Sequence, residues 1–180
     1  MKKIIALTLA SLMLFALAAC SGDTSVGGSL AEFKERHQEA WDNESFSTEG
    51  DYLYAASTHS FAKFKERRQE AWDDGNFTYD GDFCYAASTH SLTKFKERYQ
   101  EAYDNGDFLP SGAYYYAAST HSLAKFLERY QEANDTDSFS YDGDYLYAAS
   151  THSLAEFMER YKEANENLGS SFGDYAYAGW

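Results

Sequence analysis

The stretch from Ser122 to His152 reads SLAKFLERYQEANDTDSFSYDGDYLYAASTH, and near-copies of it fill most of this chain. Aligned on the first serine, the copies form units at residues 29–59, 60–90, 91–121 and 122–152, with a shortened unit at 153–180. A fixed period of this size is typical of stacked supersecondary units, each packing on its neighbours. The sequence therefore predicts a single repeat domain over residues 29–180.

The first half of each unit predicts an amphipathic helix. In the second unit Ser60 is a good N-cap, because its hydroxyl can accept a hydrogen bond from a free backbone N–H of the first turn. Phe64, Ala71 and Trp72 recur at helical spacing and define an apolar stripe. The charged positions off this stripe predict a solvated face: Glu66, Arg67 and Glu70.

The second half of each unit predicts a β-hairpin. Asp80-Gly81 and Asp142-Gly143 each lie between aromatic residues, and an Asp-Gly pair in such a setting is a strong hairpin signal. The predicted fold class is therefore α+β: five tandem 31-residue helix-plus-β-hairpin repeats, stacked with the helices on one side of a mainly antiparallel sheet.

An all-helical arrangement is the alternative. One long helix could run from Asp51 to Trp72, which would make the array an all-α solenoid. The segment from Ser57 to Ser60 reads Ser-Thr-His-Ser, which is poor helix material. We therefore rank the hairpin first and the all-α solenoid second.

The N-terminus has the pattern of a secretory signal. Lys2 and Lys3 precede an apolar run over residues 4–16, which is too short for a spanning helix with its usual flanks. We predict a signal peptide over residues 1–19.

The four residues from Leu17 to Cys20, Leu-Ala-Ala-Cys, resemble the lipobox of bacterial lipoproteins. The resemblance implies cleavage before Cys20 and attachment of lipid to that cysteine, so that the protein is exported and held on a membrane of the bacterial cell envelope. The next residue is Ser21, and a serine here resembles the pattern of lipoproteins that are sorted to the outer membrane, in hosts that have one. Residues 20–28 would then be the lipidated cysteine and a small, polar tether.

Charge and cysteine content limit the partners. The formal net charge is −14, and removing the two lysines of the leader lowers it to −16. Such a surface is repelled by nucleic acid, so we predict no nucleic-acid partner. With Cys20 lipidated, Cys84 is the only remaining thiol, and its equivalents in other units are apolar or aromatic; we expect it to be a buried small hydrophobe.

A ladder of aromatic residues is the predicted ligand-binding surface. A two-residue turn at Asp80-Gly81 would place one pair of aromatics per unit on the sheet face opposite the helices. Rigid aromatic planes with polar tips suit sugar rings and partner proteins, and a second covering layer is the structural alternative. The ten residues are Tyr52, Tyr54, Phe83, Tyr85, Tyr114, Tyr116, Tyr145, Tyr147, Tyr175 and Tyr177.

Metal binding is a weaker interpretation. His59, His90, His121 and His152 recur in register and could form a metal ladder, but each precedes an N-cap serine and could instead pack on a phenylalanine as a hydrophobic staple, which we favour. Acids cluster near the predicted turns without the order of ligands of an EF-hand. We predict no cofactor, with weak calcium binding as an alternative.

Catalytic motifs are not found in the sequence. Ser60 lies beside His59, but adjacent side chains at a helix start point apart, and no third residue or phosphate-binding loop is identifiable. We predict a non-enzymatic, lipid-anchored surface protein that acts in adhesion, scaffolding or extracellular ligand binding through the tyrosine-lined face. A glycan-binding module and a metal-binding envelope protein are the alternatives.

Overall fold

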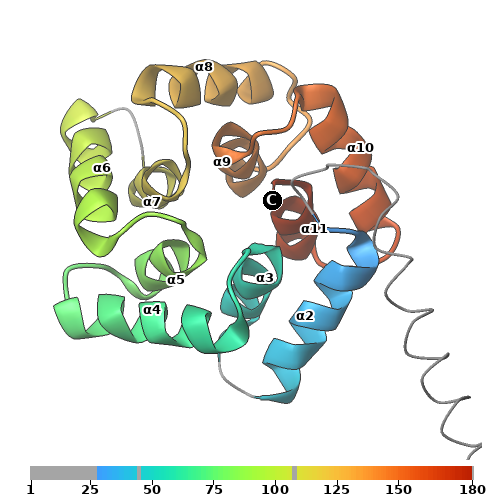
Figure 1. Ribbon diagram of the computed structural model, residues 1–180. Helices are drawn as coiled ribbons and strands as arrows, with labels where there is room; N and C mark the ends of the chain where they lie inside the picture. The colour runs from blue at the N-terminus through green and yellow to red at the C-terminus, as the bar shows by residue number, and fades with distance from the viewer. Residues whose placement is uncertain (1–27, 44–45, 107–108, 180) are drawn as a thin grey trace, which may run out of the picture.

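The computed structural model describes residues 28–43, 46–106 and 109–179, and its helices form a closed ring of two layers (Figure 1). Each repeat contributes one outer and one inner helix. The outer helices are α2 (Leu30–Asp42), α4 (Phe61–Asp74), α6 (Leu92–Asn105), α8 (Leu123–Asn134) and α10 (Leu154–Asn165). The inner helices are α3 (Thr48–Ala56), α5 (Tyr79–Ala87), α7 (Pro110–Ala118), α9 (Tyr141–Ala149) and α11 (Ser171–Gly179).

The predicted α+β fold is wrong. Over the described residues the only regular elements are helices, so the all-α alternative is the one that the structure supports. The single long helix from Asp51 to Trp72 is also wrong, because α3 ends at Ala56 and α4 begins at Phe61. The intervening Ser57–Ser60 segment separates the two helices, and Ser60 caps the second one through its hydroxyl.

The predicted hairpin turns are the first turns of the inner helices. Thr78 is the N-cap of α5, and its hydroxyl accepts a hydrogen bond from the backbone N–H of Gly81. Asp80 and Asp82 lie in the first turn, where the helix dipole favours negative charge. The Asp-Gly pair is therefore part of a helix start, and the alternating aromatics around it do not form strands.

The outer helices begin as predicted. The serine at the start of each repeat is the N-cap and accepts a backbone hydrogen bond, and Ser153 with Glu156 forms a complete capping box. Gly75 and Gly106 end α4 and α6 in the left-handed conformation, with φ of 70° and 72°. On the predicted stripe Phe64 and Ala71 are buried, whereas Trp72 is 57% exposed.

The inner helices close the ring. Neighbouring inner helices contact one another along the series α3, α5, α7, α9 and α11, and α11 contacts α3 in turn. At each junction an aromatic ring of one repeat lies against a glycine of the preceding one: a Cβ at Gly81 would lie 2.6 Å from Tyr114. A Cβ at Gly173 would lie the same distance from Tyr52, so the seam between the last and first repeats has the same packing.

A buried arginine holds each outer helix to its inner partner. Arg67 of α4 donates from Nη2 to the carbonyl oxygens of Tyr85 and His90, at 2.9 and 2.7 Å, and its guanidinium lies 4.1 Å from the centre of the Tyr85 ring. These carbonyls lie at and just beyond the end of α5, where helix carbonyls lack internal partners. The prediction of a solvated Arg67 is wrong, because only 7% of the residue is exposed. The equivalents are Arg36, Arg98, Arg129 and Arg160.

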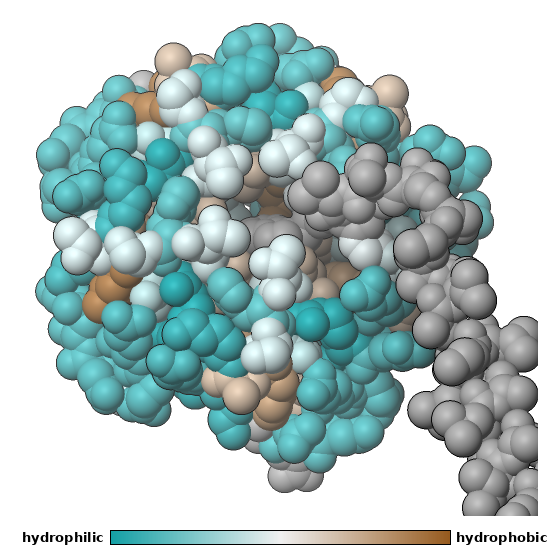
Figure 2. Space-filling model, viewed as in Figure 1, coloured by the Kyte–Doolittle hydropathy of each residue, from teal (hydrophilic) through white to brown (hydrophobic). Residues whose placement is uncertain are grey.

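One face of the ring is mainly hydrophilic. Figure 2 shows teal residues over the outer helices, paler residues nearer the centre, and brown atoms in small separate areas. The apolar side chains of the repeats are thus used largely between the two layers and between neighbouring inner helices.

Candidate functional site

The predicted ligand-binding ladder lies inside the protein. All ten residues are at most 8% exposed, so the expected exposed aromatic face is not present: Tyr52, Tyr54, Phe83, Tyr85, Tyr114, Tyr116, Tyr145, Tyr147, Tyr175 and Tyr177. The physical reason is the helical backbone. On a strand the two ladder residues of a unit share one face, whereas on a helix they point in different directions, and here both directions are covered by other helices.

The second tyrosine of each pair binds a glutamate of its own repeat. The hydroxyl of Tyr116 donates to Glu101 at 2.6 Å, and that of Tyr147 donates to Glu132 at 2.5 Å. Burial and this hydrogen bond raise the pKa of Tyr116 to about 12. Glu70, predicted to be solvated, accepts the equivalent bond from Tyr85. These tyrosines therefore join the two layers of the ring.

The first residue of each pair stacks on the outer helix. The Tyr114 ring lies 4.6 Å from that of Tyr99, and Tyr145 lies 4.8 Å from Tyr130, with nearly parallel planes. The Tyr114 hydroxyl also accepts a hydrogen bond at 3.1 Å from the backbone N–H of Thr78 in the preceding repeat. Both residues of each pair are therefore structural.

The repeated histidines connect neighbouring repeats. His59 Nε2 lies 2.7 Å from the carbonyl oxygen of Ser88, and His90 has the same contact with Ser119, as does His121 with Ser150 at 2.6 Å. The predicted hydrophobic staple, in which each histidine packs on a phenylalanine, did not include this hydrogen bond to the next repeat. Among the described residues no three His, Cys, Asp or Glu side chains come together as a metal site.

The acids of the predicted turns lie at the starts of the inner helices, in two environments. Asp51, Asp82, Asp144 and Asp174 are at most 6% exposed. Burial raises the pKa of Asp51 and of Asp144 to about 6. The residues two positions earlier, such as Glu49 and Asp80, are exposed.

Exposed aromatic residues lie instead where outer helices end and inner helices begin. Trp41, Trp72 and Tyr103 occupy equivalent positions in the first three repeats and are 59%, 57% and 62% exposed. Three more exposed residues at the starts of inner helices complete a set that we call the aromatic rim: Tyr79, Leu109 and Tyr141. The helical spacing of Trp72 matches the buried stripe and therefore predicts a core residue, but only its neighbour Ala71 is buried. The Trp72 ring lies outside the core, with the Arg68 guanidinium 5.9 Å from its centre.

Polar groups accompany the rim. Asp42, Asp73 and Asp104 each follow a rim aromatic, and each accepts a hydrogen bond of 2.6–2.7 Å from a glutamine four residues earlier. Beside Trp41 there is an open pocket, whose wall also includes Phe46, Ser47, Thr48 and Asp51. The rim thus combines exposed ring faces with positioned carboxylate acceptors.

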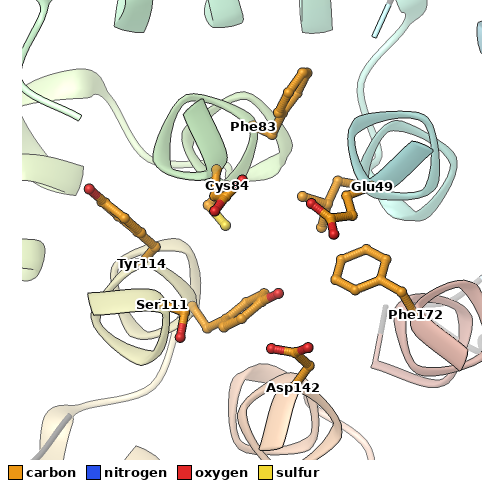
Figure 3. Close-up of a pocket in the computed structure, with 10 residues that line it drawn as sticks. Glu49, Phe83, Cys84, Ser111, Tyr114, Asp142 and Phe172 are labelled. Atoms are coloured by element: carbon orange, nitrogen blue, oxygen red, sulfur yellow. The ribbon is translucent and has the colours of Figure 1, made fainter. Parts of the chain in front are cut away.

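A second concave site lies on the ring axis, where the inner helices begin. Its volume is about 230 Å³. Figure 3 shows Glu49, Cys84, Asp142 and Phe172 approaching a common centre from four different helices, whereas Phe83 and Tyr114 point away from it. We call this space the axial cavity; its remaining lining residues are Leu53, Asp80, Ser111 and Tyr115.

The axial cavity is the place where the repeats differ. Its mouth is formed by the second residue of each inner helix, which is Glu49, Asp80, Ser111, Asp142 or Phe172. Leu53, Cys84 and Tyr115 lie deeper and are buried. Cys84 is a free, buried cysteine, as predicted, and burial raises the pKa of its thiol.

Acidic groups dominate the electrostatics of the cavity. Glu49 is exposed at the mouth, but the partial loss of water around its carboxylate in the cavity raises its pKa, and repulsion from Asp80 and Asp142 raises the pKa further. The pKa of Asp142 is raised by burial and then by Asp80. None of the residues that line the cavity is basic. The carboxylates therefore repel one another across the mouth, and a bound cation would relieve that repulsion.

The lipidation site at Cys20, the signal peptide at 1–19 and most of the tether at 20–28 lie outside the described residues. Within the described part of the chain, no helix has the length and apolar character needed to cross a bilayer. No family model, curated protein or solved structure matches this chain.

Proposed function

We propose that this protein is an exported, lipid-anchored binding protein without catalytic activity, and that its aromatic rim binds neutral glycans on the outside of the cell. The observation that carries the proposal is the repetition of large exposed aromatics at one position of successive repeats. This keeps the predicted binding function and moves it from the buried tyrosine ladder to the rim.

Exposure of these rings is unusual for this chain. Most large aromatics of the described residues are buried or partly buried in the core, whereas Trp41, Trp72 and Tyr103 are more than half exposed. Clustered exposed apolar surface in a folded protein marks interaction sites. Tryptophan and tyrosine are also the residues enriched at such sites, because they offer a large rigid area at low entropic cost.

The polar part of the rim favours sugars as ligands. A ring face can stack on the C–H face of a sugar, and the adjacent carboxylates of Asp42, Asp73 and Asp104 can accept hydrogen bonds from hydroxyl groups. The net charge of −14 disfavours anionic polysaccharides. Neutral glycans therefore fit the rim better than acidic ones.

Repetition supplies avidity. Three equivalent aromatic positions follow one another around the ring, so one extended ligand can contact several of them. Linked weak sites bind at high effective concentration, and avidity can exceed single-site affinity by about 10²–10⁴-fold. The expected behaviour is weak binding of short oligosaccharides and much tighter binding of polymers.

A glycan array followed by titration of a bound polysaccharide tests the proposal. Replacing Trp41, Trp72 and Tyr103 together by alanine should lower polysaccharide affinity at least about 10²-fold, with little change in melting temperature, because the three rings are exposed. Met158→Ala is the matched control, since Met158 is 42% exposed and lies in the middle of α10, away from the rim.

Two results would contradict this function. Binding of a protein but of no glycan on the rim would make the rim a protein interface. Equal glycan binding by the triple variant and by Met158→Ala would place the glycan site elsewhere. The anchor is tested separately: Cys20→Ser should abolish incorporation of labelled palmitate, and unchanged labelling would contradict lipidation at this residue.

A further inference from the structure

We propose that the axial cavity binds a small organic cation, held by the carboxylates of Glu49, Asp80 and Asp142 at the mouth and by the hydroxyl of Tyr115 below them. This site is distinct from the aromatic rim, because none of its lining residues belongs to the rim. The proposal is independent of glycan binding.

The hydroxyl of Tyr115 is the observation that points to a ligand. Tyr115 is 6% exposed, and within the described chain its hydroxyl has no hydrogen-bond partner, although its ring stacks on Tyr145. Cys84, Asp142, Glu49 and Asp80 line the same cavity as Tyr115, and after burial these four groups raise the pKa of Tyr115 further. Because Tyr115 lines the cavity, a polar ligand bound there would supply the hydrogen-bond partner that the protein does not provide.

Charge determines the sign of the ligand. Three carboxylates come together from α3, α5 and α9, and the lining contains no lysine, arginine or histidine to balance them. The five helix N-termini around the axis offset part of this negative charge. The net charge of −14 adds a long-range attraction for cations. An anionic ligand would be repelled both by the net charge of the protein and by the carboxylates at the mouth.

Size and wall chemistry favour an organic cation over a bare metal ion. Since no three acidic, cysteine or histidine side chains of the described chain form a metal site, one small ion would not contact all three carboxylates. A protonated amine or diamine can span them. The rings of Phe172 and Tyr115 in the wall can also contact alkyl groups or an ammonium group. The volume, about 230 Å³, lies below the ~300–1,000 Å³ of drug-sized sites and suits a small molecule.

The repeats themselves support a specific site. The outer helices and the glycine junctions are nearly identical in all repeats. The equivalent position at the cavity mouth, by contrast, is Glu, Asp, Ser, Asp and Phe in the five repeats. An asymmetric cavity can orient one small ligand. A ring required only for structure would fill its axis with equivalent residues.

Isothermal titration calorimetry with 1,4-diaminobutane tests the proposal, using 1,4-butanediol, succinate and calcium chloride as separate titrants. We expect saturable binding of the diamine at one site per chain, and no binding of the diol or of succinate. Glu49→Gln and Asp142→Asn should each weaken diamine binding about tenfold, because each removes a charge-assisted hydrogen bond. Tyr115→Phe, which removes only the unpartnered hydroxyl, should weaken it several-fold.

Glu159→Gln is the matched charge control, since Glu159 is exposed on α10 and its loss changes the net charge by the same amount. Unchanged binding by this control, with melting temperatures of all variants near that of the parent, supports the site. Equal weakening by Glu159→Gln and Glu49→Gln would show non-specific attraction and overturn it. Diamine binding no stronger than diol binding, or stoichiometric displacement of the diamine by calcium, would overturn it as well.

Discussion

Gly106 and Gly112, which flank the start of α7, are glycines for different physical reasons. Gly106 has a φ of +72°, and a Cβ there would meet nothing within 4 Å. Gly112 lies inside α7, and a Cβ there would lie 2.5 Å from the Tyr145 ring of the next repeat. The first glycine is required by backbone conformation and the second by the close approach of two repeats.

The two cases can be separated by substitution. Gly106→Ala should lower the free energy of unfolding by about 1 kcal/mol, the cost of a left-handed alanine. Gly112→Ala should lower it by about 2–3 kcal/mol, because the new methyl group displaces a packed ring. Urea denaturation followed by circular dichroism measures both. If Gly112→Ala costs no more than Gly106→Ala, the repeats do not approach as closely as the structure shows.

At the scale of the element, the end of each inner helix depends on an arginine from the outer one. Arg98 donates to the carbonyls of Tyr116, Ala117 and His121 and to the hydroxyl of Ser119. Among the described residues, Arg160 in the last repeat donates only to the carbonyl of Tyr177.

This difference predicts unequal costs for the same change. Arg98→Lys should lower the free energy of unfolding by about 3 kcal/mol, since lysine cannot reproduce the planar fork and leaves buried carbonyls unpaired. Arg160→Lys should cost about 1 kcal/mol, because it removes one such bond. Thermal melts of both variants provide the comparison, and a larger loss for Arg160→Lys would show that the hydrogen bonds of the clamp do not determine its contribution.

At the scale of the whole molecule, stability depends on closure. The contact between α11 and α3 covers both ends of the array, so no inner helix has an unpaired side. An open stack of the same units would expose the ring of Tyr52 at one end and Gly173 with its neighbours at the other. Closure thus replaces the capping repeats that open solenoids need.

Removing residues 153–180 tests closure. Without α10 and α11, the inner faces of α3 and α9 lose their partners, and we expect the shortened protein to self-associate or to lose its cooperative melting transition. Analytical ultracentrifugation and thermal melting monitored by circular dichroism measure these outcomes. A monomer that melts at the parent temperature would show that the seam contributes little.

The outer helices could be predicted from the local sequence of one unit, whereas the inner helices could not. The outer helices have serine caps, a one-sided apolar stripe and glycine ends, all of which can be read within one unit. In α5, by contrast, seven of the nine residues, Gly81–Ala87, are buried, so this part of the helix has no solvent-exposed polar face. A short apolar run of this kind has no periodicity that separates a buried helix from a strand, and the Asp-Gly pair then favoured the wrong choice.

The candidate sites show the same limit. Trp41 and Trp72 match the buried stripe by spacing, and only the tertiary structure shows that both rings are exposed. Asp80 lies 31 residues after Glu49, and Asp142 lies 62 residues after Asp80. Nothing local in the sequence indicates that these three side chains meet at the mouth of one cavity. Comparing equivalent positions across the five units shows that the position of Glu49, Asp80 and Asp142 varies from unit to unit, which is the sequence signal for this site.

The sequence by itself determined the period, the outer helices with their caps, the buried character of Cys84 and the lipobox pattern at Cys20, because each depends on neighbouring residues along the chain. Only the tertiary structure decided that the second segment of each unit is helical, that the tyrosine ladder is core, and that the array closes around an axial cavity. The physical reason is that burial on all sides removes the amphipathic signal, and curvature arises from contacts between repeats, such as ring on glycine, that no single unit contains.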